Sequence, residues 1–172
     1  PWYSARKRIK KLVLGTGITS IGDYAFYYCT KLTGSLIIPA GVARIGKGSF
    51  FSCSKLNSLT LPESITSIGW GAFGSCSGFT GSLILPNGII DIGGNAFAHC
   101  RGFSGSLSIP DSVTSIGKSA FYGCSGFTGN LRIPDSIISI EDNVFYECTG
   151  FNGQLIIPDS VTSIGYSAFY GC

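Results

Sequence analysis

Seven cysteines recur at almost equal intervals, and their spacing decides which thiol chemistry is possible. Each follows the last by 24 residues, except for one interval of 23, at Cys29, Cys53, Cys76, Cys100, Cys124, Cys148 and Cys172. Zinc sites need cysteine pairs separated by about two to four residues, whose thiolates converge on one ion. A 24-residue period instead predicts a column of parallel thiols, too far apart at Cβ for disulfides. We therefore expect buried free thiols that act as small apolar filler, with no metal site and no cofactor.

The remaining reactive side chains do not form a catalytic group. His99 is the only histidine, and other units hold residues as different as Tyr28 and Glu147 in its slot, which predicts an exposed, unspecialised position. A nucleophile needs a neighbouring base, and the sequence supplies no second histidine for such a pair. The Asp-Ser pairs at 111–112, 135–136 and 159–160 could suggest stacked carboxylates, but we interpret them as turn residues that hydrogen-bond their own backbone. We predict that the protein is not an enzyme.

The cysteine intervals are part of a repeat that runs through the whole chain. A leucine opens each unit, at Leu12, Leu36, Leu59, Leu83, Leu107, Leu131 and Leu155. The units read L-x-I-P-x-x-V-x-x-I-G-x-x-A-F-x-x-C-x-x-F-x-G-x, and we expect one array at 12–35, 36–58, 59–82, 83–106, 107–130, 131–154 and a shorter 155–172. Residues 1–11 are interpreted as a lead-in and partial cap, in which Trp2 and Tyr3 could cover part of the first coil.

Residues 107–130 show what each part of the repeat must form. The alternation in "SLSIP" (106–110) predicts a short strand that Pro110 ends. A second extended piece follows at 114–117, where we expect Gly117 to need a positive φ. The apolar residues of 120–124 have helical spacing over too short a stretch, which predicts a 3₁₀ or turn segment. One coil cannot bury its own apolar side chains, so the coils must stack, at roughly 4.8 Å, into a β-rich solenoid.

The repeated phrase "IIPDSVTSIGYSAFYGC" (156–172) and its copies resemble the BspA-like leucine-rich repeat, the short "IP..V..IG..AF..C" type. The resemblance covers residues 12–172 and implies a right-handed leucine-rich-repeat coil of about seven 23–24-residue repeats, with short parallel strands and turn or 3₁₀ segments. It also implies an extracellular or cell-surface protein whose array binds other proteins, since some family members are adhesins. One unit departs from the pattern: Glu141 replaces the glycine and Val144 the alanine, which predicts a local distortion.

Charged residues are only 12% of the chain, and they are unevenly distributed. Residues 1–60 carry nine basic and one acidic side chain, net +8, whereas residues 61–172 carry three basic and eight acidic, net −5. The overall charge of +3 is too small to indicate nucleic-acid binding, and no apolar run is long enough to predict a membrane span in this segment. The first residue is not Met and Cys172 lies inside the repeated phrase, so we expect a piece of a longer protein with uncapped ends capable of self-association.

Function must then depend on the variable, outward positions. On the strand side these include Ile37, Thr60, Ile84, Arg132 and Ile156, and the exposed isoleucines among them are of the kind that marks a contact surface. Beside the "AF" turn they include Tyr27, Trp70, Tyr122 and Tyr146, which could anchor a partner or only shield the turn. A threonine row is broken by Ala43, Ile90 and Ile138, which disfavours ice binding.

The sequence therefore predicts a non-catalytic module that binds a protein ligand on a host or bacterial surface, with adhesion as its role. The alternative is a structural element whose oppositely charged halves stack head to tail into filaments, an open mode of association.

Overall fold

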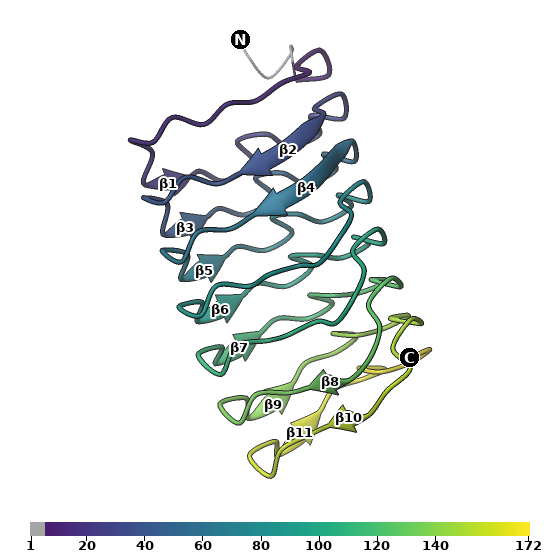
Figure 1. The fold of residues 1–172 in the computed structure, drawn as a ribbon. Helices are drawn as coiled ribbons and strands as arrows, with labels where there is room; N and C mark the ends of the chain where they lie inside the picture. Colours follow the sequence, from purple (N-terminus) through teal and green to yellow (C-terminus); the bar gives the residue numbers. More distant parts are fainter. Residues whose placement is uncertain (1–5) are drawn as a thin grey trace.

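The computed structural model describes residues 6–172, and these form a parallel β-solenoid without a helix (Figure 1). The coils follow one another from the N-terminal to the C-terminal end as a single stack. Trp2 and Tyr3, which were expected to cover the first coil, lie outside the described residues.

Two sets of short strands run along the stack. The leucine strands contain the opening leucine of a unit: β2 (Gly34–Ile37), β4 (Leu56–Thr60), β8 (Leu131–Arg132) and β10 (Leu155–Ile156). The isoleucine strands end at the isoleucine before the repeat glycine: β1 (Ser20–Ile21), β3 (Arg44–Ile45), β5 (Ser67–Ile68), β6 (Asp91–Ile92), β7 (Ser115–Ile116), β9 (Ser139–Ile140) and β11 (Ser163–Ile164). Both extended pieces predicted for a unit are therefore present, although "SLSIP" is reduced to a single bridge between Ser108 and Ile84.

Strands of successive coils pair in parallel, one repeat apart. The isoleucine strands form a five-stranded sheet in the order β1-β3-β5-β6-β7, and β9 pairs separately with β11. The leucine strands form two pairs, β2 with β4 and β8 with β10. Neither sheet is continuous, and the isoleucine sheet stops between β7 and β9, beside Glu141. The local distortion predicted for this unit is thus visible as a break in strand pairing.

The segment between glycine and cysteine is a ladder of turns. In one coil the amides of Asn95, Phe97 and His99 donate to carbonyls of the next coil at 2.9, 2.8 and 2.6 Å. Asn95 and His99 have φ values of 54° and 60°, and the equivalent two positions are left-handed in every coil. Glycine and asparagine, which tolerate this conformation best, occupy several of these slots, and serine occupies others. The slot of His99 was predicted to be exposed and unspecialised; its side chain is instead half-buried, and its backbone must adopt the left-handed conformation.

The repeat glycine is needed for close packing and not for its backbone angle. Gly117 was expected to need a positive φ, but it is not among the positive-φ glycines. A Cβ atom there would lie 2.4 Å from the backbone nitrogen of Gly94 in the preceding coil. Gly69 and Gly165 show the same close approach, at 2.7 and 2.5 Å from preceding backbone atoms. The glycine therefore sets how closely two coils can approach.

The core is a set of continuous columns. The phenylalanines of the "AF" pairs stack nearly parallel with centroids 5.1–5.6 Å apart: Phe26, Phe50, Phe73, Phe97, Phe121, Phe145 and Phe169. A second column, from Phe79 through Phe103 and Phe127 to Phe151, meets the first edge to face. Aromatic pairs favour these two arrangements, and each buried ring adds apolar area, so the columns hold the coils in register.

Candidate binding faces

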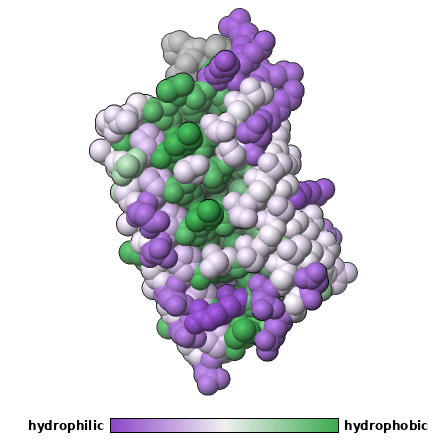
Figure 2. Space-filling view, viewed as in Figure 1, coloured by the Kyte–Doolittle hydropathy of each residue, from purple (hydrophilic) through white to green (hydrophobic). Residues whose placement is uncertain are grey.

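The leucine strands present an exposed aliphatic row on their outer side. The exposed fraction is 63% for Ile37, 75% for Ile84 and 39% for Ile156, and Thr60 between them is also exposed. Their strand neighbours Leu36 and Leu83 are buried, as the alternation of a strand requires. We call these outward residues, together with Val13 and Arg132, the strand face. Figure 2 shows a broken hydrophobic stripe down this side of the molecule.

Two shallow hollows lie along the strand face. One has a volume of about 400 Å³ and is bounded by residues 12–14 and 35–37. The other has a volume of about 480 Å³ and lies between 82–85 and 106–108, with Glu63 and Asn87 at its rim. Aliphatic side chains and serines line both hollows, a mixture that suits protruding apolar side chains of a partner.

Arg132 interrupts the aliphatic row with a charged cluster. Its guanidinium contacts Asp111 Oδ1 at 2.6 Å and Asp135 Oδ2 at 2.9 Å, and these carboxylates raise the pKa of Arg132 above its usual range. All three side chains are largely exposed, so this cluster contributes little to stability. This charged cluster separates Ile156 from the other aliphatic residues of the strand face.

The tyrosines predicted beside the turn lie in one row, which is divided into two stacks. Tyr122 and Tyr146 stack at 4.7 Å and continue to Tyr170 at 4.9 Å, whereas Tyr27 stacks on Phe51 at 5.3 Å. Gly74 and Ala98 occupy the coils between these two stacks, as the 24-residue register requires.

Trp70 belongs to a different row, which follows the repeat glycine. Lys47 Nζ lies 5.3 Å from the centroid of Trp70 and 5.8 Å from that of Tyr24, which are cation–π distances. Tyr122 and Tyr146 are only half-exposed because they stack on each other, and Tyr27 is half-exposed because it packs on Phe51. The structure therefore does not bring the four predicted rings together as one surface.

The cysteines form the predicted column of free thiols. Six are buried, but Cys172 is exposed, so the prediction that all seven are buried is wrong at Cys172. Each thiol from Cys53 onward donates a hydrogen bond to the carbonyl of the phenylalanine in the preceding coil; Cys100 Sγ, for example, lies 3.1 Å from Phe73 O. Burial raises the pKa of Cys53 and Cys124 to about 12. The sequence predicted the column but missed the hydrogen bond, because the period places the thiols without showing which carbonyl they face.

The other reactive residues take structural roles. The ring of His99 packs against Tyr122 with centroids 5.0 Å apart, and burial lowers its pKa, an effect that Arg101 reinforces. The hydroxyl of Ser112 donates to Ile89 O of the preceding coil at 2.6 Å, and Ser136 and Ser160 repeat this bond. The Asp-Ser pairs thus link neighbouring coils through serine, and the prediction that they bond their own backbone is not what the structure shows.

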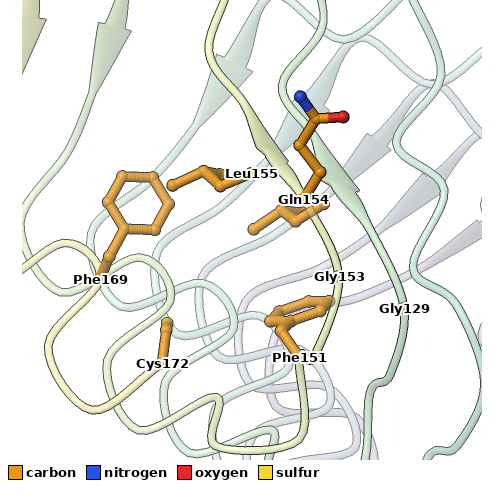
Figure 3. A pocket seen from close by; sticks show the side chains of 8 residues that line it. Gly129, Phe151, Gly153, Gln154, Leu155, Phe169 and Cys172 are labelled. Atoms are coloured by element: carbon orange, nitrogen blue, oxygen red, sulfur yellow. The ribbon is translucent and has the colours of Figure 1, made fainter.

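A third hollow, of about 320 Å³, lies at the last two coils. Figure 3 shows Leu155, Phe151, Phe169 and Cys172 around it, while the amide of Gln154 points away. Phe145 and Leu131, the equivalents of Phe169 and Leu155 one coil earlier, are buried. We interpret this hollow as the exposed side of a coil rather than as a ligand site.

Neither metal-binding nor membrane-spanning features are found in the part of the chain that the structure describes. No group of three or more His, Cys, Asp or Glu side chains in residues 6–172 is arranged to hold a metal ion. No helix in the same residues is long and apolar enough to cross a bilayer.

These features define the chain as a β-solenoid repeat protein with two variable outer surfaces. It belongs to the BspA type leucine rich repeat family, whose model matches residues 3–128 and 125–172 with six copies. This confirms the resemblance found in the repeated phrase. No curated protein is significantly similar to the chain.

Solved structures of bacterial leucine-rich repeat proteins share the fold. The T. pallidum leucine rich repeat protein superposes with a TM-score of 0.83 at 29% identity, over 94% of this chain and 76% of that one. A leucine-rich repeat protein from Bacteroides ovatus gives a TM-score of 0.68 at 28% identity, over 95% of this chain and 55% of its own. A leucine rich cell surface protein from Faecalibacterium prausnitzii gives 0.59 at 24% identity, over 94% and 58%, which shows the fold alone.

Proposed function

We propose that the chain is a non-catalytic protein-binding module and that the strand face is its contact surface. The observation that carries this proposal is the exposure of Ile37 and Ile84, at 63% and 75%, beside two shallow hollows. Water around exposed aliphatic side chains is released when a partner covers them, so such a row favours association. The turn tyrosines fit this role less well because Tyr122, Tyr146 and Tyr170 already cover one another.

The proposed partner is a protein on a host or neighbouring bacterial cell, and the proposed location is extracellular or at the cell surface. Membership of the BspA type family supports this, since the resemblance implies adhesion for some members. The basic side chains of residues 1–60 would speed the encounter with an acidic partner, because opposite charges steer association.

The test compares three multiple variants for adhesion to matrix proteins and to cell surfaces. Ile37/Ile84/Ile156→Ser removes the aliphatic row of the strand face, and we expect adhesion to fall at least tenfold, because a few apolar anchors dominate most interfaces. Tyr27/Trp70/Tyr122/Tyr146→Ser alters the turn side and should reduce adhesion much less.

The matched control is Ile90/Ile138→Ser. These two isoleucines are 50% and 63% exposed beside the isoleucine strands, so the same chemical change is made away from the strand face. Thermal unfolding of each variant separates loss of binding from loss of fold. If the strand-face variant folds and adheres as well as this control, the strand face is not the contact surface.

Head-to-tail assembly is the second candidate, and the charge asymmetry between residues 1–60 and 61–172 favours it. Sedimentation at low and high salt distinguishes the two. A series of oligomers that dissociates with added salt supports assembly, because screening weakens attraction between opposite charges. A monomer under both conditions supports the binding module.

A further inference from the structure

One slot of the repeat changes from lysine to glycine along the chain. It lies two residues after the cysteine position, between the turn and the leucine strands. The first three coils hold lysine in this slot: Lys7, Lys31 and Lys55. The next four hold glycine: Gly78, Gly102, Gly126 and Gly150. We call the three lysines the lysine column.

Packing confines the lysine column to the first three coils. A Cβ atom at Gly78 would overlap the carbonyl oxygen of Ser54 in the preceding coil, and one at Gly102 would overlap that of Phe79. The neighbouring core slot changes at the same point, from Leu56 to Phe79. The later coils therefore have no room for a side chain in this slot, so a basic column cannot continue along them.

The three lysines are in register with one another. The amide one residue after Lys31 donates to the carbonyl two residues before it at 3.0 Å, and the same bond closes the turn around Lys55 at 3.1 Å. Thr33 joins the first coil to this register, because its amide and hydroxyl both donate to Lys10 O, at 3.0 and 3.1 Å. Lys7, Lys31 and Lys55 therefore follow the solenoid axis at roughly 4.8 Å per coil.

The positive charge of the lysine column is not neutralised by the protein. All three lysines are exposed, and none of them forms an ion pair within residues 6–172. The one acidic residue of 1–60 is Asp23, whose carboxylate accepts the backbone amide of Lys47 at 2.8 Å on the turn side. Figure 2 shows hydrophilic side chains gathered at the N-terminal end, beside the hydrophobic stripe. Like charges at this spacing repel one another, so an anion lying along the column would relieve the repulsion.

The side chains around the lysine column indicate the class of anion. The loops that carry it, residues 6–11, 30–35 and 54–58, contain no aromatic residue. Single-stranded nucleic acids are bound by aromatic stacking as well as by charge, and protein partners need aromatic or apolar anchors. The loops instead offer hydroxyl groups next to the lysines, at Thr30 and Ser54. Hydroxyl groups suit the hydroxyls of a sugar, and ammonium groups suit its acidic substituents.

We propose that the lysine column binds a linear sulfated polysaccharide of the glycosaminoglycan type, which runs along the solenoid axis. Its sulfate groups contact the ammonium groups of the column, and the exposed Lys10 and Lys11 of the first coil extend the basic surface at its end. Clusters of basic residues are a common feature of heparin-binding surfaces. This surface is separate from the strand face and does not depend on the proposed binding of a protein partner.

Titration of the folded protein with labelled heparin fragments tests the proposal. Lys7/Lys31/Lys55→Gln should weaken binding at least tenfold and make the affinity less dependent on salt, because fewer counterions are released from the polyanion. Replacing the same three lysines by arginine keeps the charge and should keep the binding. Failure of the unaltered protein to bind heparin would overturn the proposal.

The matched control is Arg44/Lys47/Lys118→Gln, which removes the same charge from exposed positions on the other sides of the solenoid. It should change heparin affinity less than twofold. Thermal unfolding confirms that both variants are folded. If the two variants lose affinity equally, heparin responds only to overall charge and the lysine column is not its site.

Other ligands and one further variant test the class of partner. Uncharged dextran should not bind, and single-stranded DNA and phosphatidylserine vesicles should bind more weakly than heparin. Tighter binding of DNA or vesicles, lost in the glutamine variant of the column, would assign the column to that ligand and overturn the polysaccharide. Ile37/Ile84/Ile156→Ser should bind heparin as the unaltered protein does, even where it loses adhesion to a protein partner. A loss of heparin binding in this variant would place the polysaccharide on the strand face instead.

Discussion

Inward and outward positions of the solenoid recur with the same period, but they differ in how strictly the residue type is fixed. Inside, the phenylalanine column from Phe26 to Phe169 is unbroken, with one ring from every coil. Outside, the adjacent tyrosine row is interrupted by Gly74 and Ala98. A buried slot must be apolar and of one size, because a polar group there loses water and a smaller one leaves a cavity. The outer slots have no such requirement, so stability depends on the columns and the residue types of the outer rows can vary.

The largest effect should come from breaking the phenylalanine column. Phe97 has no exposed surface and lies between Phe73 at 5.4 Å and Phe121 at 5.6 Å. Phe97→Ala should lower the free energy of unfolding by about 3–5 kcal/mol, the usual cost of truncating a buried aromatic ring. Equilibrium unfolding in urea measures it.

Tyr122→Ala is the matched truncation on the outer row, since Tyr122 is half-exposed and stacks on Tyr146. Its cost should stay near 1 kcal/mol, the range for an aromatic pair. A loss below about 1 kcal/mol for Phe97→Ala would contradict the distinction between column and row.

The thiol column should make the protein sensitive to alkaline pH. Burial raises the pKa of Cys124 to about 12, against about 8.5 for an unfolded cysteine. A pKa raised on folding contributes stability that is complete below the unfolded value and is lost as pH rises toward the folded one. The thiol of Cys124 should therefore remove about 1.4 kcal/mol of stability per pH unit between about pH 9 and 12.

Cys124→Ala isolates one thiol from the tyrosines and lysines that titrate in the same range. The slope of the unfolding free energy against pH should become shallower by the contribution of one titrating proton, about 1.4 kcal/mol per pH unit. An unchanged slope would mean that the thiol of Cys124 ionises equally well in the folded protein.

Strict periodicity made much of this fold predictable from sequence. The 24-residue register located both strands of a unit, the thiol column and the inward side chains such as Phe97, because stacking in register is the only way a short coil can bury them. The sequence identified the glycine of the repeat, but the reason predicted for its presence was wrong. Whether Gly117 is needed for its φ or for close approach depends on the neighbouring coil, which lies 23 residues away in sequence at Gly94.

The outer surfaces were less predictable, because contacts there depend on which coil carries which residue. The sequence grouped Trp70 with Tyr27, Tyr122 and Tyr146 by residue type, but Trp70 lies in another row, over Lys47. Arg132 was placed on the strand face correctly, yet its contact with Asp111 spans 21 residues and has no local signal. Both misses involve long side chains reaching between coils.

A smaller difference in stability distinguishes two roles for the buried thiols, apolar filler and hydrogen-bond donor. Cys100 Sγ lies 3.1 Å from Phe73 O, which also accepts the amide of Cys76 at 3.0 Å. Cys100→Ser keeps a donor at this carbonyl, whereas Cys100→Ala removes it. If the hydrogen bond matters, both should cost about 1 kcal/mol and the serine variant should be the more stable.

The opposite order would show that the thiol acts only as an apolar filler, because a buried hydroxyl without a good partner is costlier than a methyl group. The two unfolding curves should be measured at pH 7, where the thiol of Cys100 is protonated because burial raises its pKa.

The smallest effect on stability should come from the strand face. Ile84 is 75% exposed, so Ile84→Ser removes little buried area and should change the free energy of unfolding by no more than about 0.5 kcal/mol. Ile92→Ser alters the same residue type at a fully buried position of the β6 strand and should cost several times more. Urea unfolding of both variants gives the comparison. A cost above about 1.5 kcal/mol for Ile84→Ser would mean that the strand face contributes to stability, and a row with that role is less free to vary for recognition.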